Sequence, residues 1–377
     1  MKRVCIIAGE ASGDLHGAAL VKALKEEGEE LSFFGLGGPR LEALGVEMVC
    51  PPPLNVVGFV EAALRISHLL KAYRKVKRFL KEERPDLIIL IDYPDMNLRL
   101  ARAAHEVGVP VLYYISPQVW AWRSGRVKAI ARYVDRLAVI LPFEVEFYRR
   151  HGIEVDFVGH PLLDGLADIL SQDPPSGPSQ DREEVIGLFP GSRPTEVNNI
   201  LPLMLETAEG LHRIYPGRFR FILPVAGTLD PGVIRERTRP VQERGLPLTV
   251  STEDSRRVMR RCRLIVAASG TVTLEAALLE VPMVVVYKVA PLNYWIARLL
   301  IRIPYVALVN WVAGKKVVPE YLQGEARPEA VIEGCRRFLE DGEYDGQVRR
   351  ELRAVKAQLG EPGASRRVAR IAWEMMG

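Results

Sequence analysis

The sequence predicts an α/β protein built from two Rossmann-like, doubly wound domains. Short apolar runs rich in β-branched residues alternate with longer segments of helical periodicity, the alternation breaks once, and it then restarts. Runs that are apolar at nearly every position are typical of strands buried on both faces, as in parallel sheets covered by helices. A chain of 377 residues is also longer than one typical domain.

The apolar runs that predict strands recur in both halves of the chain. They occupy residues 4–8, 31–36, 86–92, 109–116 and 136–141 in the first half, and 185–190, 219–225, 246–251, 263–269 and 281–287 in the second. The segments between them favour helices; within 61–83, Leu69, Tyr73, Val76 and Leu80 recur every three or four residues. Strands that alternate with helices in this way predict parallel sheets.

A single compositional break divides the chain. Residues 171–182 include SQDPPSGPSQD, which is too rich in proline, serine and glycine to hold a regular element. We therefore expect a first domain at 1–170, a linker at 171–182, a second domain at 183–345 and a helical C-terminal segment at 346–377. Ligands of doubly wound sheets bind beyond the carboxyl ends of the strands, so the loops that follow strands are the candidate sites.

The overall composition argues against several classes of function. A net charge of +4, from 51 basic and 47 acidic residues, gives no global reason to expect nucleic-acid binding. Cys5, Cys50, Cys262 and Cys335 lie far apart without a CxxC pair, which favours a reducing compartment. The histidines lack metal-ligand spacing, so we expect neither a metal nor a cofactor. The N-terminal apolar run is too short for a signal peptide, and no run is long enough to span a membrane.

The first predicted strand leads into GEASGDLHG, at 9–17. Ser12 and Gly13 are small enough to let a ligand approach the backbone, and Asp14 is suited to cap the following helix. A tight structural turn and a ligand loop fit this pattern equally well. A second glycine-rich turn, FGLGGPR at 34–40, favours the structural interpretation.

Two carboxylates stand where the strand at 86–92 meets its loop, in the sequence IDYPDMN. Partial burial at a strand end raises the pKa of a carboxyl group toward the range of a general base, so Asp92 is the candidate catalytic residue. In the alternative interpretation Asp92 supports the turn and Asp95 caps the next helix.

The loop LFPGSRPTEV, at 188–197, repeats the order of strand, glycine turn, basic residue and helix. Arg193 at the start of a helix is electrostatically unfavourable, because the N-terminal end of the helix dipole disfavours a cation. A bound anion would resolve the conflict, and so would an ion pair with Glu196. The residues alone leave both alternatives open.

The segment ASGTVTLEAALLEVP, at 268–282, is the most informative in the chain. Ser269, Gly270 and Thr271 follow a predicted strand and precede a helix, which is the usual place of a phosphate cradle. Glu275, one turn into the helix, is placed to accept hydrogen bonds from ribose hydroxyls. The alternative is an ordinary Ser/Thr cap that Glu275 completes.

Three further features allow more than one interpretation. SPQVWAWRSGRVKAI, at 116–130, fits a stacking and phosphate platform, an amphipathic surface, or tryptophans packed in the core. The apolar segment 291–312 fits a buried helix and strand or a lipid-facing surface. His160, at a strand end in FVGHP, is the one histidine that we retain as a site candidate.

In their order along the chain, these motifs resemble those of lipid-A-disaccharide synthases, which are inverting glycosyltransferases of the GT-B type. The resemblance rests on GEASGD, GGP, VGFVEA, IDYPD, SPQVWAW, LPFE, FVGHP, PGSR and ASGTVTLE, and extends from Val4 to about Gln323. It implies two Rossmann-like domains that face a cleft. It also implies a reaction in which UDP-2,3-diacylglucosamine and 2,3-diacylglucosamine 1-phosphate give the β-1′,6-linked disaccharide 1-phosphate and UDP.

The resemblance also implies roles for individual residues. Asp92 of IDYP is the expected general base, Arg193 of PGSR neutralises the departing UDP, and the SGT sequence at 269–271 holds its phosphates. Glu275 and Asn310 complete the nucleotide site. The chain departs from the family pattern at Val57, where methionine is common, and at VNWVAG, at 309–314, where a longer polar loop is frequent.

From the resemblance we expect the two acylated sugars and the inner-membrane surface as partners, with a peripheral, cytoplasmic location. Nucleic acid is not expected, and a homodimer is one alternative for the oligomeric state. The competing functions are another GT-B enzyme, such as a peptidoglycan N-acetylglucosaminyltransferase or a UDP-N-acetylglucosamine 2-epimerase, and a non-catalytic nucleotide-sugar-binding or membrane-scaffold protein.

Overall fold

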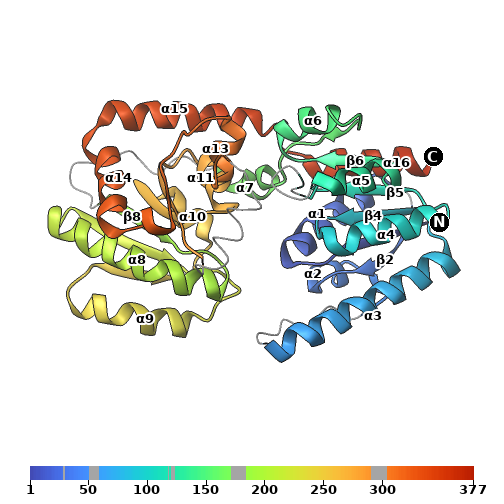
Figure 1. Cartoon of the computed structure of the whole chain (residues 1–377), viewed down its shortest axis with the longest axis horizontal. Helices are drawn as coiled ribbons and strands as arrows, with labels where there is room; N and C mark the ends of the chain where they lie inside the picture. Colours follow the sequence, from blue (N-terminus) through green and yellow to red (C-terminus); the bar gives the residue numbers. More distant parts are fainter. Residues whose placement is uncertain (29, 51–58, 118, 120–123, 171–183, 290–303) are drawn as a thin grey trace. The chain divides into compact units, whose positions relative to one another are not determined.

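The computed structural model describes the chain except residues 29, 51–58, 118, 120–123, 171–183 and 290–303. The chain divides into two compact units (Figure 1), unit 1 with Met1–Asp164 and Gly360–Gly377, and unit 2 with Gly165–Leu359. The linker expected at 171–182 lies outside the described residues.

Unit 1 is built on a seven-stranded parallel sheet with the strand order β3-β2-β1-β4-β5-β6-β7. Its strands are β1 (Lys2–Ala8), β2 (Leu31–Leu36), β3 (Glu47–Met48), β4 (Leu87–Ile91), β5 (Val111–Tyr114), β6 (Arg136–Val139) and β7 (Asp156–Phe157). Its helices are α1 (Ala11–Glu26), α2 (Pro39–Glu42), α3 (Phe59–Glu83), α4 (Pro94–Glu106), η1 (Ser124–Arg126), α5 (Val127–Tyr133), α6 (Pro142–Arg149) and α16 (Ala364–Met376). The division between the units falls within α7 (Leu162–Leu170).

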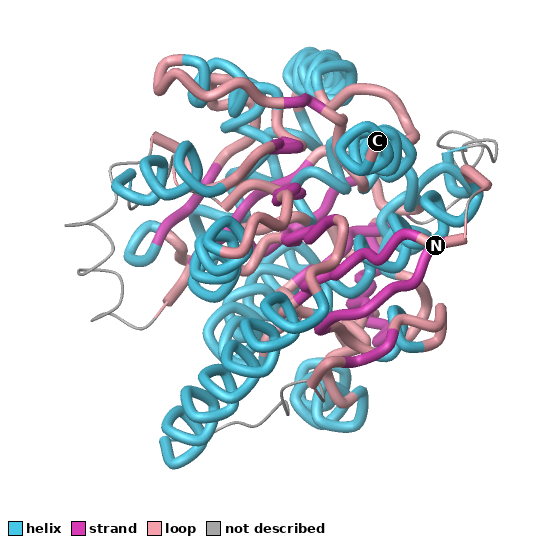
Figure 2. The backbone as a smooth tube through the Cα atoms, turned by 90° about the vertical axis from the view of Figure 1, so that its right-hand side faces the viewer, coloured by secondary structure: helices cyan, strands magenta, loops and turns pink. Residues whose placement is uncertain are grey.

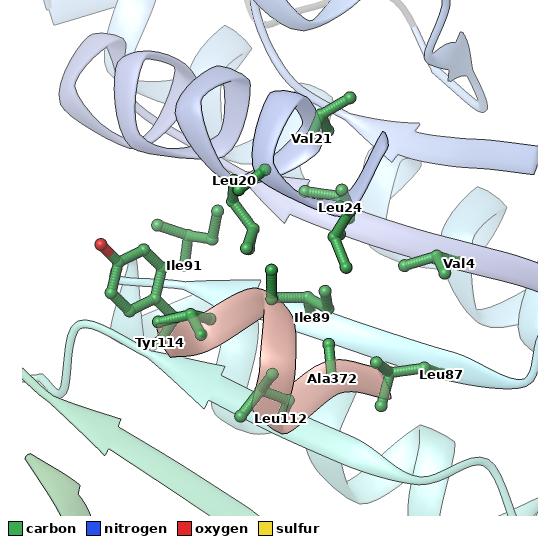
Figure 3. Close-up of a cluster of buried hydrophobic side chains, with 14 of the residues drawn as sticks. Val4, Leu20, Val21, Leu24, Leu87, Ile89, Ile91, Leu112, Tyr114 and Ala372 are labelled. Atoms are coloured by element: carbon green, nitrogen blue, oxygen red, sulfur yellow. The ribbon is translucent and has the colours of Figure 1, made fainter. Parts of the chain in front are cut away.

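Successive residues of β1, β4 and β5 enter two different cores, because side chains alternate across a sheet. On one face, β1, β4 and β5 pack against α1 and α16; Figure 3 shows Leu20 and Leu24 of α1 directed toward the β4 side chains. On the other face the same strands pack against α3, α4 and α5. Helices therefore cover both faces of the sheet, as the uninterrupted apolar strands predict (Figure 2).

The C-terminal segment expected at 346–377 is divided between the units. Residues up to Leu359, with all of α15 (Gly342–Gln358), belong to unit 2, whereas Gly360–Gly377 belong to unit 1. Within α16, Val368 and Ala372 are fully buried in the first core of unit 1, which includes β1. The Lys2 side chain donates a hydrogen bond to the Met376 carbonyl at 3.2 Å, which connects the start of β1 to the end of α16.

Unit 2 is built on a six-stranded parallel sheet with the order β10-β9-β8-β11-β12-β13. Its strands are β8 (Glu184–Phe189), β9 (Phe219–Pro224), β10 (Leu248–Ser251), β11 (Leu264–Ala268), β12 (Met283–Tyr287) and β13 (Glu320–Leu322). Its helices are α8 (Pro194–Ile214), α9 (Pro231–Glu243), α10 (Ser255–Arg260), α11 (Val272–Leu278), α13 (Leu308–Ala313), η2 (Gln323–Glu325), α14 (Pro328–Glu340) and α15.

The strands predicted from apolar runs are all present, and the structure adds the short β3, β7 and β13. The order of strands in each sheet reverses at one point: between β1 and β4 in unit 1, and between β8 and β11 in unit 2. At such a switch point the connections leave in opposite directions and open a crevice beyond the carboxyl ends of the strands. The candidate loops follow these four strands, so each sheet presents two of them side by side.

Candidate functional site

The loop after β4 begins with an unusual backbone conformation. Asp92 and Tyr93 both adopt left-handed conformations, with φ of 47° and 48°, before Pro94 starts α4. A non-glycine residue in this region costs about 1–2 kcal/mol. Two such residues in succession are retained where the surrounding structure enforces them, which is typical of functional sites.

The Asp92 carboxyl group is half-buried beyond the carboxyl end of β4. The pKa of this group is raised to about 6, mainly by burial and also by the negative charge of Glu10, while a hydrogen bond from the Tyr93 N–H opposes the shift. A carboxylate whose pKa lies close to neutrality can both accept a proton and be ionised at the working pH. The structure therefore gives Asp92 the environment of a general base.

Asp95 has a different environment from Asp92. It is exposed in the first turn of α4 and forms an ion pair with Arg126. The alternative in which Asp95 caps this helix is wrong, because Tyr93 occupies the N-cap position and Pro94 begins the helix.

The loop after β1 lies next to the Asp92 loop, since Ala8 pairs with Ile91 at the ends of the two strands. A Cβ atom on Gly9 would lie 2.2 Å from the Tyr93 ring, so this position requires glycine. α1 begins at Ala11, and Ser12 is exposed within its first turn. Ser12 and Gly13 therefore lie at the start of the helix rather than in a separate loop.

The prediction that Asp14 caps its own helix is wrong. Asp14 lies inside α1, is 4% exposed, and accepts hydrogen bonds from the backbone N–H groups of Gly38 (2.8 Å), Arg40 (3.1 Å) and Leu41 (3.1 Å). It therefore fixes the second glycine-rich turn, which supports the structural interpretation of that turn. Gly38 is needed there, because a Cβ atom would lie 2.7 Å from the Asp14 carboxylate.

His160 is buried, and its Nδ1 atom accepts a hydrogen bond from the Leu162 N–H at 3.2 Å. The pKa of its ring is lowered to about 3, mainly by burial and also by the nearby His16. The ring is therefore neutral at physiological pH and holds the chain at the start of α7.

In unit 2, the loop after β8 places Arg193 at the N-cap of α8. Its guanidinium donates to Glu196 at 3.1 Å, so the ion pair considered from the sequence is present, yet the Arg193 side chain remains 72% exposed. An exposed pair of this kind contributes little to stability. The guanidinium is consequently accessible to a ligand anion.

The loop after β11 contains Ser269, Gly270 and Thr271. The Ser269 hydroxyl donates to the Val306 carbonyl at 2.8 Å, and the Thr273 hydroxyl donates to the Gly270 carbonyl at 2.8 Å. Thr271 occupies the N-cap of α11, but its side chain makes no capping hydrogen bond, so the ordinary Ser/Thr cap is not formed. Among the described residues, nothing lies within 4 Å of the position of a Cβ atom on Gly270, so within this part of the chain the backbone is open to an approaching group.

Glu275 lies one turn further along α11. Burial raises the pKa of its carboxyl group to about 7; Arg256 opposes the shift and Asp254 adds to it. Arg256 is itself engaged by Asp254, with its Nε donating at 2.9 Å. Among the residues that the structure describes, the Glu275 carboxylate has no hydrogen-bond partner, so it can accept hydrogen bonds from a ligand hydroxyl.

Asn310 does not have an open side chain. It is completely buried, its amide donates to the Val318 carbonyl (3.0 Å) and to Glu320 (2.7 Å), and its oxygen accepts from the Val317 and Val318 N–H groups (2.7 and 3.0 Å). Every hydrogen-bonding position of the side chain is thus used within unit 2. Glu320 in turn accepts from the Val306 and Ala307 N–H groups, at 2.9 and 3.0 Å.

Sequence reasoning missed three side chains that support these loops, namely Asn97, Tyr113 and Glu320. Asn97 and Tyr113 donate to the Asp92 carbonyl, and Glu320 connects Asn310 to the segment that Ser269 contacts. Asn97 stands inside the IDYPDMN motif and could have been noticed there. Tyr113 lies in an apolar run that predicts an ordinary strand, and Glu320 lies in a stretch for which no strand was predicted, so no sequence signal distinguished them.

Two features singled out in the sequence fall largely outside the described residues. Gln118 and residues 120–123 of the segment 116–130 are among the undescribed positions, as are residues 291–303 of the apolar segment 291–312. Within the part that the structure describes, no helix is both long and apolar enough to cross a bilayer. The described residues also contain no group of three or more histidine, cysteine or acidic side chains that could hold a metal ion.

Comparison with known proteins identifies relatives over the full length of the chain. The sequence model of a family described as lipid-A-disaccharide synthetase matches residues 4–371. The chain is 47% identical to lipid-A-disaccharide synthase of Geobacter sulfurreducens, over 100% of this chain and 97% of that protein. It is likewise 47% identical to the enzyme of the same name from Geobacter metallireducens, over 100% and 98%.

Solved structures of low sequence identity share the fold. A co-structure of MnaA of S. aureus with UDP aligns with a TM-score of 0.67 at 14% identity, covering 100% of this chain and 97% of that one. MurG of Acinetobacter baumannii aligns with a TM-score of 0.62 at 16% identity, covering 99% and 100%. The calicheamicin glycosyltransferase CalG4 aligns with a TM-score of 0.61 at 17% identity, covering 100% and 98%. The two units thus have the GT-B fold.

Proposed function

We propose roles for individual residues from the premise that the chain belongs to the lipid-A-disaccharide synthetase family. The protein is accordingly a hexosyltransferase that forms the lipid A disaccharide. The donor is UDP-2,3-diacylglucosamine, the acceptor is 2,3-diacylglucosamine 1-phosphate, and the products are the β-1′,6-linked disaccharide 1-phosphate and UDP. The first unit serves the acceptor and the second unit binds the donor nucleotide.

Asp92 is the general base of this reaction. It takes the proton of the acceptor 6-hydroxyl while that oxygen attacks the anomeric carbon of the donor, and the bond from this carbon to the UDP oxygen breaks with inversion. The observation that carries the assignment is the half-buried carboxyl group with a pKa near 6 at the switch point of the first sheet. A positioned base of this kind contributes about 10²–10⁴ in rate.

Ser12 and Gly13 are substrate contacts of the same unit. They stand in the first turn of α1, directly after the β1 end that pairs with β4. Asp14 acts indirectly, because its carboxylate is already occupied by the backbone of the 38–41 turn.

Arg193 and the backbone at Ser269, Gly270 and Thr271 hold the diphosphate of the donor. The leaving UDP carries negative charge that grows as the glycosidic bond breaks, and a guanidinium can stabilise it with charge-assisted hydrogen bonds. Arg193 is exposed, and its one partner among the described residues is the Glu196 carboxylate, so a diphosphate can bind the guanidinium at little energetic cost. Glu275 accepts hydrogen bonds from the ribose hydroxyls.

Asn310 is a positioning residue rather than a ligand of the nucleotide. Its amide holds Glu320, Glu320 holds the Val306 and Ala307 amides, and the Val306 carbonyl receives the Ser269 hydroxyl. This chain of hydrogen bonds gives Asn310 an effect on the nucleotide loop although its own side chain is fully used.

The substrates carry acyl chains, which supports a peripheral location at the cytoplasmic side of the inner membrane. A homodimer is a further proposal for the assembly. Sedimentation of the protein with vesicles of anionic phospholipid tests the membrane location. The mass in solution, measured by light scattering, tests the homodimer. Protein that stays in the supernatant with all vesicle compositions would contradict the membrane proposal.

The decisive test combines the purified protein with both acylated sugars and follows UDP release and disaccharide formation by mass spectrometry. We expect both products in equal amounts and no UDP release when the acceptor is omitted. Asp92→Asn should lose about 10²–10⁴-fold in turnover, the range given above for a positioned base, while Asp95→Asn serves as the matched control because Asp95 is exposed and paired with Arg126. Release of UDP without acceptor would show hydrolysis instead of transfer.

A further inference from the structure

The peptide groups on both sides of the Asp92 Cα atom are held by hydrogen bonds. The Asp92 N–H donates to the Tyr114 carbonyl at 3.1 Å. The Asp92 carbonyl accepts two side-chain hydrogen bonds, from Asn97 Nδ2 at 2.7 Å and from the Tyr113 hydroxyl at 2.6 Å. Asp92 lies beyond the end of β4. Without these two bonds its carbonyl would be buried with no hydrogen-bond partner, which is energetically unfavourable.

The Asn97 side chain serves to donate hydrogen bonds to the backbone at the end of β4. Its side chain is fully buried, and Nδ2 also donates to the Ile91 carbonyl at 3.1 Å. Its Oδ1 atom has no hydrogen-bond partner among the described residues. The opposite orientation of the amide would direct Oδ1 at two carbonyl oxygens, so the orientation is fixed by its neighbours. An apolar residue would avoid the unpaired acceptor but would lose both donors.

Tyr113 supplies the second donor from the neighbouring strand β5. It is fully buried, and burial, followed by the charge of Asp92, raises the pKa of its hydroxyl well above the ordinary value. The hydroxyl therefore stays protonated at every pH at which the enzyme works. Tyr114, the next residue, points to the opposite core, and its buried hydroxyl has no hydrogen-bond partner among the described residues.

We propose that Asn97 and Tyr113 are positioning residues that hold Asp92 in the left-handed conformation from which its carboxylate acts on the acceptor. The two consecutive left-handed residues are unfavourable by themselves, and the three side-chain hydrogen bonds to the 91 and 92 carbonyls oppose their relaxation. This inference rests on the proposed role of Asp92 as the base.

The first experiment removes the donors and keeps the volume. In Asn97→Leu we expect kcat to fall at least about tenfold, and in Tyr113→Phe about three- to tenfold, with KM for both sugars within about threefold of the wild type. Tyr114→Phe is the matched control, because it removes a hydroxyl at the adjacent position of the same strand that faces the opposite core; its kcat should stay within about twofold. Circular dichroism confirms that the variants are folded.

The second experiment separates positioning from a general loss of structure. The same two substitutions are made in an Asp92→Asn background, and the residual turnover is measured. If Asn97 and Tyr113 act through the base, they have nothing left to position, and the residual rate should change less than about twofold. A purely structural role would slow both backgrounds by the same factor, since effects of residues that do not act together are additive.

The outcomes distinguish this inference from the proposal on which it depends. Wild-type turnover in Asp92→Asn would remove the base role and with it the reason for positioning. A slow Asp92→Asn combined with wild-type kcat in Asn97→Leu and Tyr113→Phe would overturn the positioning role alone. Equal losses in both backgrounds would overturn it as well.

Discussion

Replacement of Asp92 by asparagine should lower the turnover of the enzyme and, at alkaline pH, raise its free energy of unfolding. The pKa of the Asp92 carboxyl group rises from an ordinary 3.8 to about 6 in the folded protein, mainly through burial. One pKa unit corresponds to about 1.4 kcal/mol, so holding the ionised group costs the folded state about 3 kcal/mol once it is fully ionised. An asparagine at this position would not carry this cost, and it keeps the shape of the side chain.

The sign of the pH dependence follows from the raised pKa. A carboxyl group with a folded-state pKa above its unfolded-state value destabilises the folded state at high pH. The penalty is complete above about pH 6 and vanishes below about pH 4. The gain in Asp92→Asn should therefore be about 3 kcal/mol at pH 8 and about half of that at pH 5.

The assay is denaturant unfolding of wild type and variant at pH 8 and pH 5, followed by tryptophan fluorescence, next to UDP release at pH 8. Asp95→Asn, the exposed neighbour, is the control and should show no comparable gain. Two results would refute the inference that burial destabilises the ionised form of this carboxyl group. In the first, Asp92→Asn is no more stable than the wild type at pH 8. In the second, its gain in free energy of unfolding is the same at both pH values.

Four further changes test other parts of the structure. Gly9→Ala should destabilise unit 1 by about 1–3 kcal/mol in urea unfolding, because its Cβ atom would lie 2.2 Å from the Tyr93 ring; an unchanged midpoint would contradict this packing. Arg193→Ala should weaken UDP binding in calorimetry by about 10–100-fold, the range of a charge-assisted hydrogen bond, and equal affinity would remove Arg193 from the site. UDP affinity should fall as the pH drops below about 7, where Glu275 becomes protonated, and Glu275→Gln should lose this dependence beyond the titration of the phosphates; identical pH profiles would refute the ribose contact. Asn310→Ala should lower the free energy of unfolding by about 2–5 kcal/mol in denaturant titration, since it leaves buried partners unpaired; a fully stable variant with weak UDP binding would restore Asn310 as a direct ligand.

The strands could be predicted from the sequence because burial on both faces leaves a signal in every residue. The run at 31–36 is a strand with those bounds, and the run at 86–92 contains Leu87–Ile91. β3 and β7 were missed because two residues carry no periodicity. The same local logic placed Asp92, Arg193 and the SGT loop correctly at strand ends.

The roles of polar side chains were less predictable, because their partners are distant in the chain. Asp14 looked like the cap of its own helix, whereas its carboxylate binds backbone 24 residues away at Gly38. Asn310 was expected to complete the nucleotide site, and in the structure its amide donates to Glu320, 10 residues further on. Contacts between residues that are distant along the chain leave no pattern in the local sequence, so they could not be predicted from it.

The sequence by itself determined the alternation of strands and helices, the division into two domains and the loops at which we propose the chemistry takes place. These features depend on residue types and on spacing along the chain, which the sequence contains in full. Only the tertiary structure decided which strands are neighbours at the two switch points and how the Asp92 backbone is held. It also decided that the side chains of Asp14 and Asn310 form hydrogen bonds within the protein. A hydrogen bond requires two atoms within about 3 Å, and only the folded chain brings atoms from separate segments that close.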